Sequence, residues 1–248
     1  MKYLDPSGLF YYDGSAQQQS SSSASSGNSS SGNNSTPTPN ISGQPQSPTP
    51  QVPDTSAMPG MLGEKLIMID PGYGGDQEGS KGAGLIEKNI NLTVSYMVLS
   101  KLEEAGIKSE LTRKYDKTTS LQDRYTDANS KDADIFVSIH TNSTNPLKKG
   151  FSIIIPNNNA TRGIQSGWLG ICIGKELKQT ENIHEGPDSI YQDNRGLAVL
   201  NGTQMPAVLI EIGYIVGDSK NLKNQVYLDS IATGISSGII NYLSGEKK

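Results

Sequence analysis

The sequence predicts an α/β fold, a mostly parallel twisted sheet flanked by helices, in a single catalytic-type domain that follows a disordered linker. Two observations predict it. Short runs such as residues 66–69 and 207–210 are apolar throughout, which is typical of strands buried on both faces. Longer segments between them carry apolar residues at helical spacing, and this alternation favours helices packed on a parallel sheet.

The chain divides into three regions by composition. Residues 15–63 contain a single charged residue, Asp54, and are dominated by Ser, Asn, Gln, Pro and Gly. Such a segment has too little apolar surface to offset its loss of chain entropy, so it is expected to be a disordered linker. The globular pattern occupies residues 64–248.

Residues 1–14, MKYLDPSGLFYYDG, place an aromatic cluster ahead of the linker. The cluster suggests a docking peptide that becomes ordered on a partner, although a tail of no consequence explains it equally well. The element LDPSGL resembles the opening residues of some phage tail and fibre proteins. That resemblance implies a phage structural protein as partner.

The first half of the domain begins with the apolar strand at residues 66–69, which ends in Asp-Pro-Gly. Residues 89–105 have helical spacing, and Gly106 is a natural helix stop. An alternating strand is expected at residues 107–112 and a helix at 121–129.

The second half begins with two buried strands, at residues 135–140 and 151–155. A helix is expected at 162–178 and a short strand at 197–200. The apolar run at 207–210 follows Pro206 and predicts another buried strand, and a closing helix is expected at 226–243.

Composition excludes several classes of protein. The formal net charge is −4, which argues against a nucleic-acid partner because phosphate binding requires a concentrated basic face.

The single cysteine, Cys172, excludes an internal disulfide. It lies in an apolar run and is expected to be buried, with a reactive thiol as the alternative. No segment is apolar enough to span a membrane, and no signal peptide is seen at the N-terminus, so export would need another route.

Polar residues follow three of the predicted strands. They are DPGYGG at residues 70–75, SIHTN at 138–142 and EIGY at 211–214. Ligands of open α/β sheets bind outside the carboxyl ends of the strands, so these three segments are expected to form a site.

Three side chains near these strand ends are candidates for chemistry. Glu211 directly follows four apolar residues, and a carboxylate is costly to bury there unless it has a partner. His140 ends a buried strand and could equally be a structural histidine. Glu87 begins a helix, where a carboxylate also favours the helix dipole. Together they indicate a metal or acid/base site.

The domain resembles the zinc-dependent N-acetylmuramoyl-L-alanine amidases with a His-Glu-His metal site. The matching strings span residues 66–243 in the family's order. They are IDPGYGG at 69–75, Gly79, Gly82, Gly84, Glu87-Lys88, LTR at 111–113 with Asp116, LQDR at 121–124 with Ala128-Asn129, SIHTNS at 138–143 and PAVLIEIGY at 206–214.

The resemblance implies roles for particular residues. Glu87 and His140 match two zinc ligands, and Glu211 matches the glutamate that serves as general base and then general acid. Asn142 and Arg195 lie in segments near the family's groove and are candidates for substrate contact. The implied substrate is peptidoglycan, cleaved between N-acetylmuramic acid and L-alanine.

One position departs from the family. The first zinc ligand of the family is the histidine of DPGHGG, and this chain has Tyr73 there. Catalytic zinc usually has three protein ligands, and a phenol must first lose a proton whose ordinary pKa is near 10. His184, Asp76 and Glu78 are further candidate ligands, although a loop histidine and solvated loop carboxylates explain them as well.

Two functions from different classes therefore remain open. The first is a zinc-dependent, endolysin-like peptidoglycan hydrolase, extracellular or virion-associated, on a phage tail or similar particle. The second is a catalytically impaired module of the same fold that binds cell wall or serves a structural role, because Tyr73 replaces a zinc ligand.

Overall fold

The computed structural model describes residues 2–4, 10–12, 63–143, 145–157, 161–180 and 183–245, with the backbone alone at 2–4, 10–12, 187 and 188. The chain divides into two compact units, Met1–Thr49 and Pro50–Lys248. In the first unit, β1 (Lys2–Leu4) and β2 (Phe10–Tyr12) pair as antiparallel strands. The predicted linker lies outside the described residues except for Gly63.

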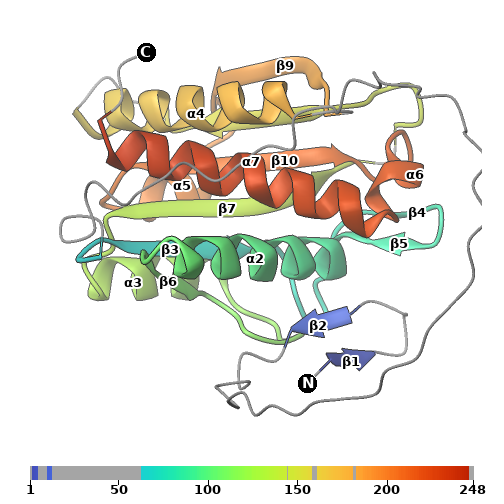
Figure 1. Cartoon of the computed structure of the whole chain (residues 1–248), viewed down its shortest axis with the longest axis horizontal. Helices are drawn as coiled ribbons and strands as arrows, with labels where there is room; N and C mark the ends of the chain where they lie inside the picture. The colour runs from blue at the N-terminus through green and yellow to red at the C-terminus, as the bar shows by residue number, and fades with distance from the viewer. Residues whose placement is uncertain are drawn as a thin grey trace, which may run out of the picture. The chain divides into compact units, whose positions relative to one another are not determined.

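The second unit is built on a six-stranded sheet with the order β6-β3-β7-β10-β8-β9 (Figure 1). Four strands run parallel, and β8 and β9 run parallel to each other but opposite to the rest. The mostly parallel sheet predicted from the sequence is therefore confirmed. The strands are β3 (Leu66–Pro71), β6 (Lys108–Leu111), β7 (Ile135–Asn142), β8 (Phe151–Ile155), β9 (Glu185–Gln192) and β10 (Ala207–Tyr214).

Helices cover both faces of this sheet (Figure 1). One face packs against α2 (Glu87–Glu104), α4 (Thr161–Gln179) and α7 (Gln225–Leu243). The other packs against α3 (Leu121–Ser130) and α5 (Ala198–Gly202). The smaller elements are α6 (Ser219–Leu222) and the pair β4 (Lys81–Gly82) and β5 (Leu85–Ile86).

Alternation along each strand creates the two apolar layers. In β3, Ile67 and Ile69 belong to the cluster under α2, α4 and α7, whereas Leu66 and Met68 belong to the cluster under α3 and α5. Successive side chains of a strand point to opposite faces, so one apolar run supplies both layers. This explains why the strands are continuous apolar runs. Cys172 is buried and free, as predicted.

The prediction for residues 197–200 was wrong, because a short helix, α5, occupies residues 198–202. The buried carboxylate of Asp193 accepts hydrogen bonds from the backbone N–H groups of Arg195 and Leu197, which directs the chain into this helix. A further strand, β9, was not predicted from the sequence.

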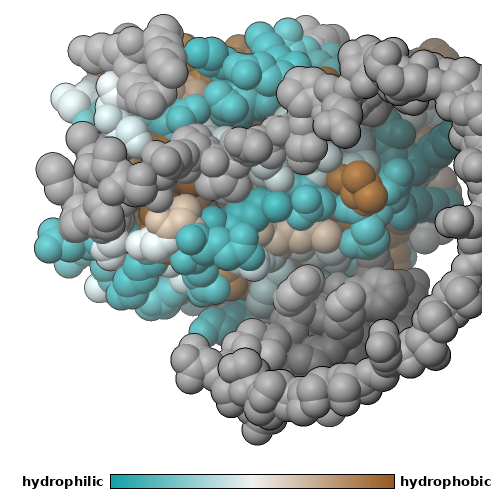
Figure 2. Space-filling view, viewed as in Figure 1, coloured by the Kyte–Doolittle hydropathy of each residue, from teal (hydrophilic) through white to brown (hydrophobic). Residues whose placement is uncertain are grey.

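The surface in view in Figure 2 is largely hydrophilic, with isolated apolar areas where residues are described. None of the described helices combines the length and apolar character needed to cross a membrane.

Candidate active site at the carboxyl ends of β3, β7 and β10

The loop that follows β3 is held by two buried arginines. Arg113 donates from Nε to the Pro71 carbonyl (2.9 Å) and from Nη2 to the Gly72 carbonyl (3.1 Å). Arg124 donates from Nη1 to the Pro71 carbonyl (2.7 Å) and from Nη2 to the Tyr73 carbonyl (2.8 Å). Three consecutive carbonyls thus have fixed partners, so the loop that carries Tyr73 is positioned by the protein interior.

Asp70 anchors the same clamp. Its Oδ1 lies 2.7 Å from Arg124 Nη1, and its Oδ2 accepts from the Ser138 hydroxyl (2.7 Å). Burial alone would raise the pKa of Asp70, but Arg124, Thr112 and Ser138 outweigh burial and lower it. The loop, β7 and α3 are therefore joined through one buried ion pair.

Replacing Asp70 by asparagine should lower the free energy of unfolding by about 3–5 kcal/mol, because Arg124 would keep a buried charge without its counter-ion. Urea unfolding followed by circular dichroism measures this. The control is Glu110→Gln, which breaks the partly exposed Glu110–Lys131 pair and should cost less than about 1 kcal/mol. Equal losses in the two variants would contradict the assigned role of Asp70.

Glu87, the first residue of α2, is buried at the centre of the site. Its Oε2 accepts from the Ser80 N–H (2.8 Å) and its Oε1 from the Thr141 N–H (3.0 Å). Burial opposes its ionisation, but His140 and these N–H groups keep its pKa below the ordinary value. Both backbone donors lie outside the helix, so the carboxylate joins the β4 region to the end of β7.

His140, near the end of β7, lies beside this carboxylate. Its Nδ1 is 3.0 Å from Glu87 Oε1. Burial lowers the pKa of His140, but the nearby carboxylates of Glu87, Glu211 and Asp70 raise it overall. The imidazole is also close to the β3 loop, since a Cβ on Gly72 would lie 2.3 Å from its Cε1 atom. A side chain at residue 72 would therefore displace the His140 ring.

Glu211 lies on β10 directly opposite His140 in the parallel register. Its Oε2 is buried and has no hydrogen-bond partner among the described residues. Burial, followed by the charge of Glu87, raises the pKa of Glu211 to about 7, against the lowering effect of His140 and Arg195. A buried carboxyl group with an unsatisfied oxygen is a candidate proton acceptor.

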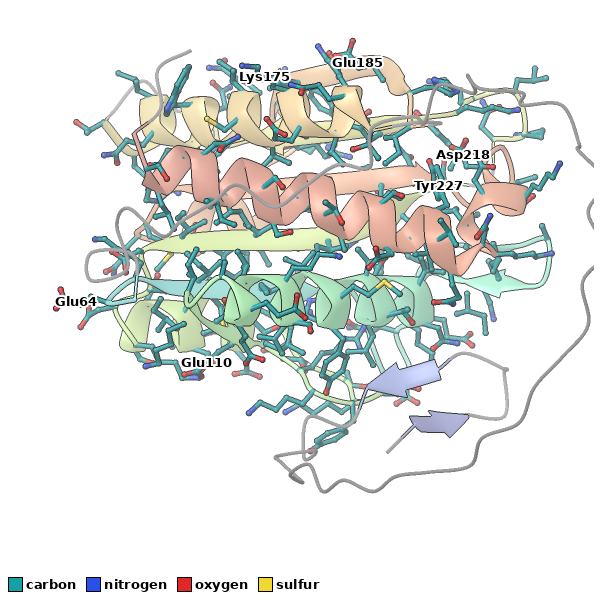
Figure 3. The ribbon with its side chains drawn as sticks, viewed as in Figure 1. Glu64, Glu110, Lys175, Glu185, Asp218 and Tyr227 are labelled. Atoms are coloured by element: carbon teal, nitrogen blue, oxygen red, sulfur yellow. The ribbon has the colours of Figure 1, made fainter. Side chains whose placement is uncertain are left out.

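The segment that follows Glu211 is fixed by Asp218. Its Oδ2 accepts from the backbone N–H groups of Gly150 (2.9 Å) and Tyr214 (2.8 Å). Asp218 and Tyr227 lie near one another in Figure 3, and the charge of Asp218 adds to burial in raising the pKa of Tyr227. This arrangement ties the start of β8 to the end of β10.

Tyr73 completes the cluster. It has a left-handed backbone conformation (φ 59°), and its ring meets that of His140 edge to face, with centroids 5.2 Å apart. The residue is 37% exposed. Burial and the charges of Glu87 and Glu211 raise the pKa of its phenol. The neutral phenol is therefore favoured at this position.

Two of the side chains at this site are suitable zinc ligands. The carboxylate of Glu87 and the imidazole of His140 are two ordinary zinc donors that converge. The described residues contain no group of three His, Cys, Asp or Glu side chains that could hold a metal. A third protein ligand of these types is therefore not supplied, and the phenol of Tyr73 would bind zinc well only after it loses its proton.

The structure also places the remaining candidate residues, which are Asn142, Arg195, His184, Asp76 and Glu78. The Asn142 side chain accepts from the Ser143 N–H (2.7 Å), and Arg195 lies in the loop after β9, close enough to lower the pKa of Glu211. His184 is an exposed residue just before β9. Asp76 is exposed, and Glu78 pairs with Lys81. The roles of Arg113 and Arg124 were not predicted, since nothing in their spacing shows burial.

This fold and site define an α/β protein with a carboxylate–imidazole–carboxylate centre at the carboxyl ends of its parallel strands. The chain belongs to the N-acetylmuramoyl-L-alanine amidase family, whose profile matches residues 67–241. The family suggested by the sequence motifs is thereby confirmed.

Individual relatives agree with this assignment. The chain is 35% identical over 194 residues to an endolysin of Bacillus phage SPP1, covering 74% of this chain and 68% of the relative. Among solved structures, the amidase AmiC2 of Nostoc punctiforme matches with a TM-score of 0.64 at 32% identity, covering 73% of this chain and 97% of that one. An amidase from Clostridium difficile 630 matches with a TM-score of 0.63 at 31% identity, covering 73% of this chain and 98% of that one.

Proposed function

We propose that this chain is a zinc-dependent peptidoglycan hydrolase that cleaves the amide between N-acetylmuramic acid and L-alanine of the stem peptide. Membership of the amidase family supports the substrate. The observation that carries the proposal is Glu211, a buried carboxylate with an unpartnered oxygen, opposite His140 and near Glu87. Hydrolysis of an amide needs a proton acceptor of this kind.

Glu87 and His140 would hold the zinc ion, with Tyr73 at the third protein position. When bound, zinc polarises the amide carbonyl and activates water. The protein's own contribution is to fix these donors. Backbone N–H groups orient Glu87, and the clamp of Arg113 and Arg124 holds the Tyr73 loop.

Glu211 carries the proton in this proposal. It takes a proton from the attacking water as the water oxygen bonds to the amide carbon. It then delivers that proton to the nitrogen of L-alanine as the carbon–nitrogen bond breaks. The products are a carboxylate on the lactyl group of N-acetylmuramic acid and a stem peptide with a free N-terminal alanine. We assign substrate contact to Asn142 and Arg195.

Digestion of purified cell walls tests the proposal. Zinc-supplemented protein should release stem peptides with new N-terminal alanine, measured by mass spectrometry after labelling of amines. Chelator-treated protein should release none, and zinc should restore the activity. Absence of new alanine termini at high protein concentration would contradict the proposal.

One observation favours a second function, a cell-wall-binding or structural module of the same fold. Burial and two neighbouring carboxylates raise the pKa of the Tyr73 phenol, which disfavours the anionic form that zinc requires. Such a module would bind glycan strands or stem peptides at the same strand ends. Substitution of Tyr73 by histidine distinguishes the two functions.

We further propose that residues 1–14 dock on a structural protein of a phage particle, so that residues 15–63 tether an extracellular, virion-associated domain. The LDPSGL element and the polar composition of the tether support this location. A synthetic peptide of residues 1–14 should enrich a virion structural protein from disrupted particles of the phage concerned. A scrambled peptide is the control, and equal recovery by both would contradict the docking role.

A further inference from the structure

An arginine lies in a loop that borders the candidate site, because Leu197, two residues after it, lines a cavity together with Tyr73 and His140. Arg195 is in the loop between β9 and α5, and its side chain is 59% exposed. Its positive charge is close enough to lower the pKa of Glu211. A cation is thus kept within electrostatic reach of the reacting centre.

The internal partner of Arg195 leaves most of the guanidinium available. Asp193, which is buried, lies 3.3 Å from Arg195 Nε and also accepts from the backbone N–H groups of Arg195 and Leu197. Among the described residues, no hydrogen-bond partner is found for the two terminal nitrogens of Arg195. Asp193 therefore positions the side chain while its outer edge can bind a ligand.

A cavity of about 550 Å³ adjoins this side chain. Its lining consists of Tyr191, Gln192, Asn194 and Arg195. These side chains include one guanidinium and two amides, and none of them is a carboxylate. Such a lining suits an anionic group that accepts several hydrogen bonds, and an arginine can hold a carboxylate with two of them.

We propose that Arg195 binds the free α-carboxylate of the second stem-peptide residue, D-glutamate, and so distinguishes it from the amidated form. This inference rests on the proposed function for the identity of the substrate. D-Glutamate is joined through its γ-carboxyl group, which leaves the α-carboxylate free next to the L-alanine. Standard backbone dimensions place that carboxylate roughly 6 Å from the scissile nitrogen.

The scissile nitrogen must lie next to Glu211, which delivers the proton, and Arg195 lies within electrostatic reach of the same carboxylate. The first anionic group of the stem peptide is therefore positioned close to the cation. Amidation of that group removes its charge and one strong acceptor, so the amidated ligand forms a weaker contact.

Binding of two soluble ligands tests the inference. They are N-acetylmuramoyl-L-alanyl-D-glutamate and its D-isoglutamine counterpart, titrated by calorimetry into the chelator-treated full chain so that no turnover occurs. The native chain should bind the acid about 10-fold or more tightly than the amide, since a charge-assisted contact is lost. Arg195→Gln should bind both equally, and Arg195→Lys should retain part of the preference.

Lys175→Gln is the matched control, because it removes one positive charge from an exposed position on α4, on the other face of the sheet (Figure 3). It should keep the full preference for the acid. Equal binding by the native chain, a preference that survives in Arg195→Gln, or no binding of either ligand would each overturn the inference.

The binding experiment separates this inference from the proposed hydrolysis. Preference for the acid without any release of alanine from cell walls would contradict hydrolysis and leave the Arg195 site in place. Hydrolysis of both ligands with equal kcat/KM, unchanged in Arg195→Gln, would contradict the Arg195 site and leave the hydrolase.

Discussion

Replacement of Tyr73 by histidine should tighten zinc binding at pH 7 on the order of 10²- to 10³-fold and raise the release of alanine from cell walls. The phenol must lose a proton to bind zinc, and an ordinary pKa near 10 makes this cost roughly 4 kcal/mol at pH 7. Burial and the charges of Glu87 and Glu211 raise the phenol pKa further. Imidazole binds as a neutral donor and avoids this cost.

The measurement is competition for zinc against a chelator of known affinity, together with the cell-wall assay. Tyr73→Phe is the control, because it keeps the ring and removes the oxygen. If the phenol oxygen ligates zinc in the native chain, Tyr73→Phe should bind zinc more weakly than the native chain. Zinc affinities that are equal in all three proteins would contradict a metal site next to residue 73.

The outcome for activity decides between the two proposed functions. An inert native chain that gains zinc and hydrolysis with Tyr73→His supports the binding module. A native chain that already releases alanine, and releases more after the substitution, supports the hydrolase. The left-handed backbone of residue 73 and the Arg124 contact to its carbonyl do not depend on the side chain, so the loop should keep its course.

Replacement of Glu211 by glutamine should reduce hydrolysis about 10²- to 10⁴-fold, because the amide cannot take the proton from water. The variant should also be at least as stable as the native chain when both are free of metal. Burial raises the pKa of Glu211 to about 7, so the ionised carboxylate is disfavoured in the folded state at neutral pH. A neutral amide of similar shape removes that cost.

Comparison with Glu104→Gln controls for loss of a carboxylate. Glu104 is exposed at the end of α2, in the helix layer on the opposite face of the sheet from α3 and α5. It should leave both activity and stability unchanged. Alanine release by Glu211→Gln at the native rate would exclude Glu211 as the proton carrier.

The buried strands could be predicted from the sequence because they carry apolar side chains on both faces of the sheet. Residues 66–69 and 207–210 lie in β3 and β10, where alternate side chains enter different clusters. β9 escaped prediction because its sequence, EGPDSIYQ, is mostly polar and includes Pro187, which is tolerated at the edge of a sheet. The helix α5 was mistaken for a strand because a short apolar run has no distinct period.

The candidate site was predictable only in part. Strand ends explain why the segments of Tyr73, His140 and Glu211 meet. The contact between Glu87 and His140 depends on the turn through Ser80 that brings α2 to β7, and no local pattern in the sequence encodes it. The carboxylate of Glu87 bonds to backbone N–H groups of Ser80 and Thr141, which lie outside the helix that it begins. Its role as a zinc ligand stays a prediction.

The most direct test of the account is a crystal structure of the native chain grown with excess zinc, with anomalous data on both sides of the zinc absorption edge. One anomalous peak is expected in contact with Glu87 and His140, beside Tyr73 and near Glu211. No peak at these residues, with the Glu87–His140 hydrogen bond intact, would contradict the proposed zinc site and the hydrolysis that depends on it.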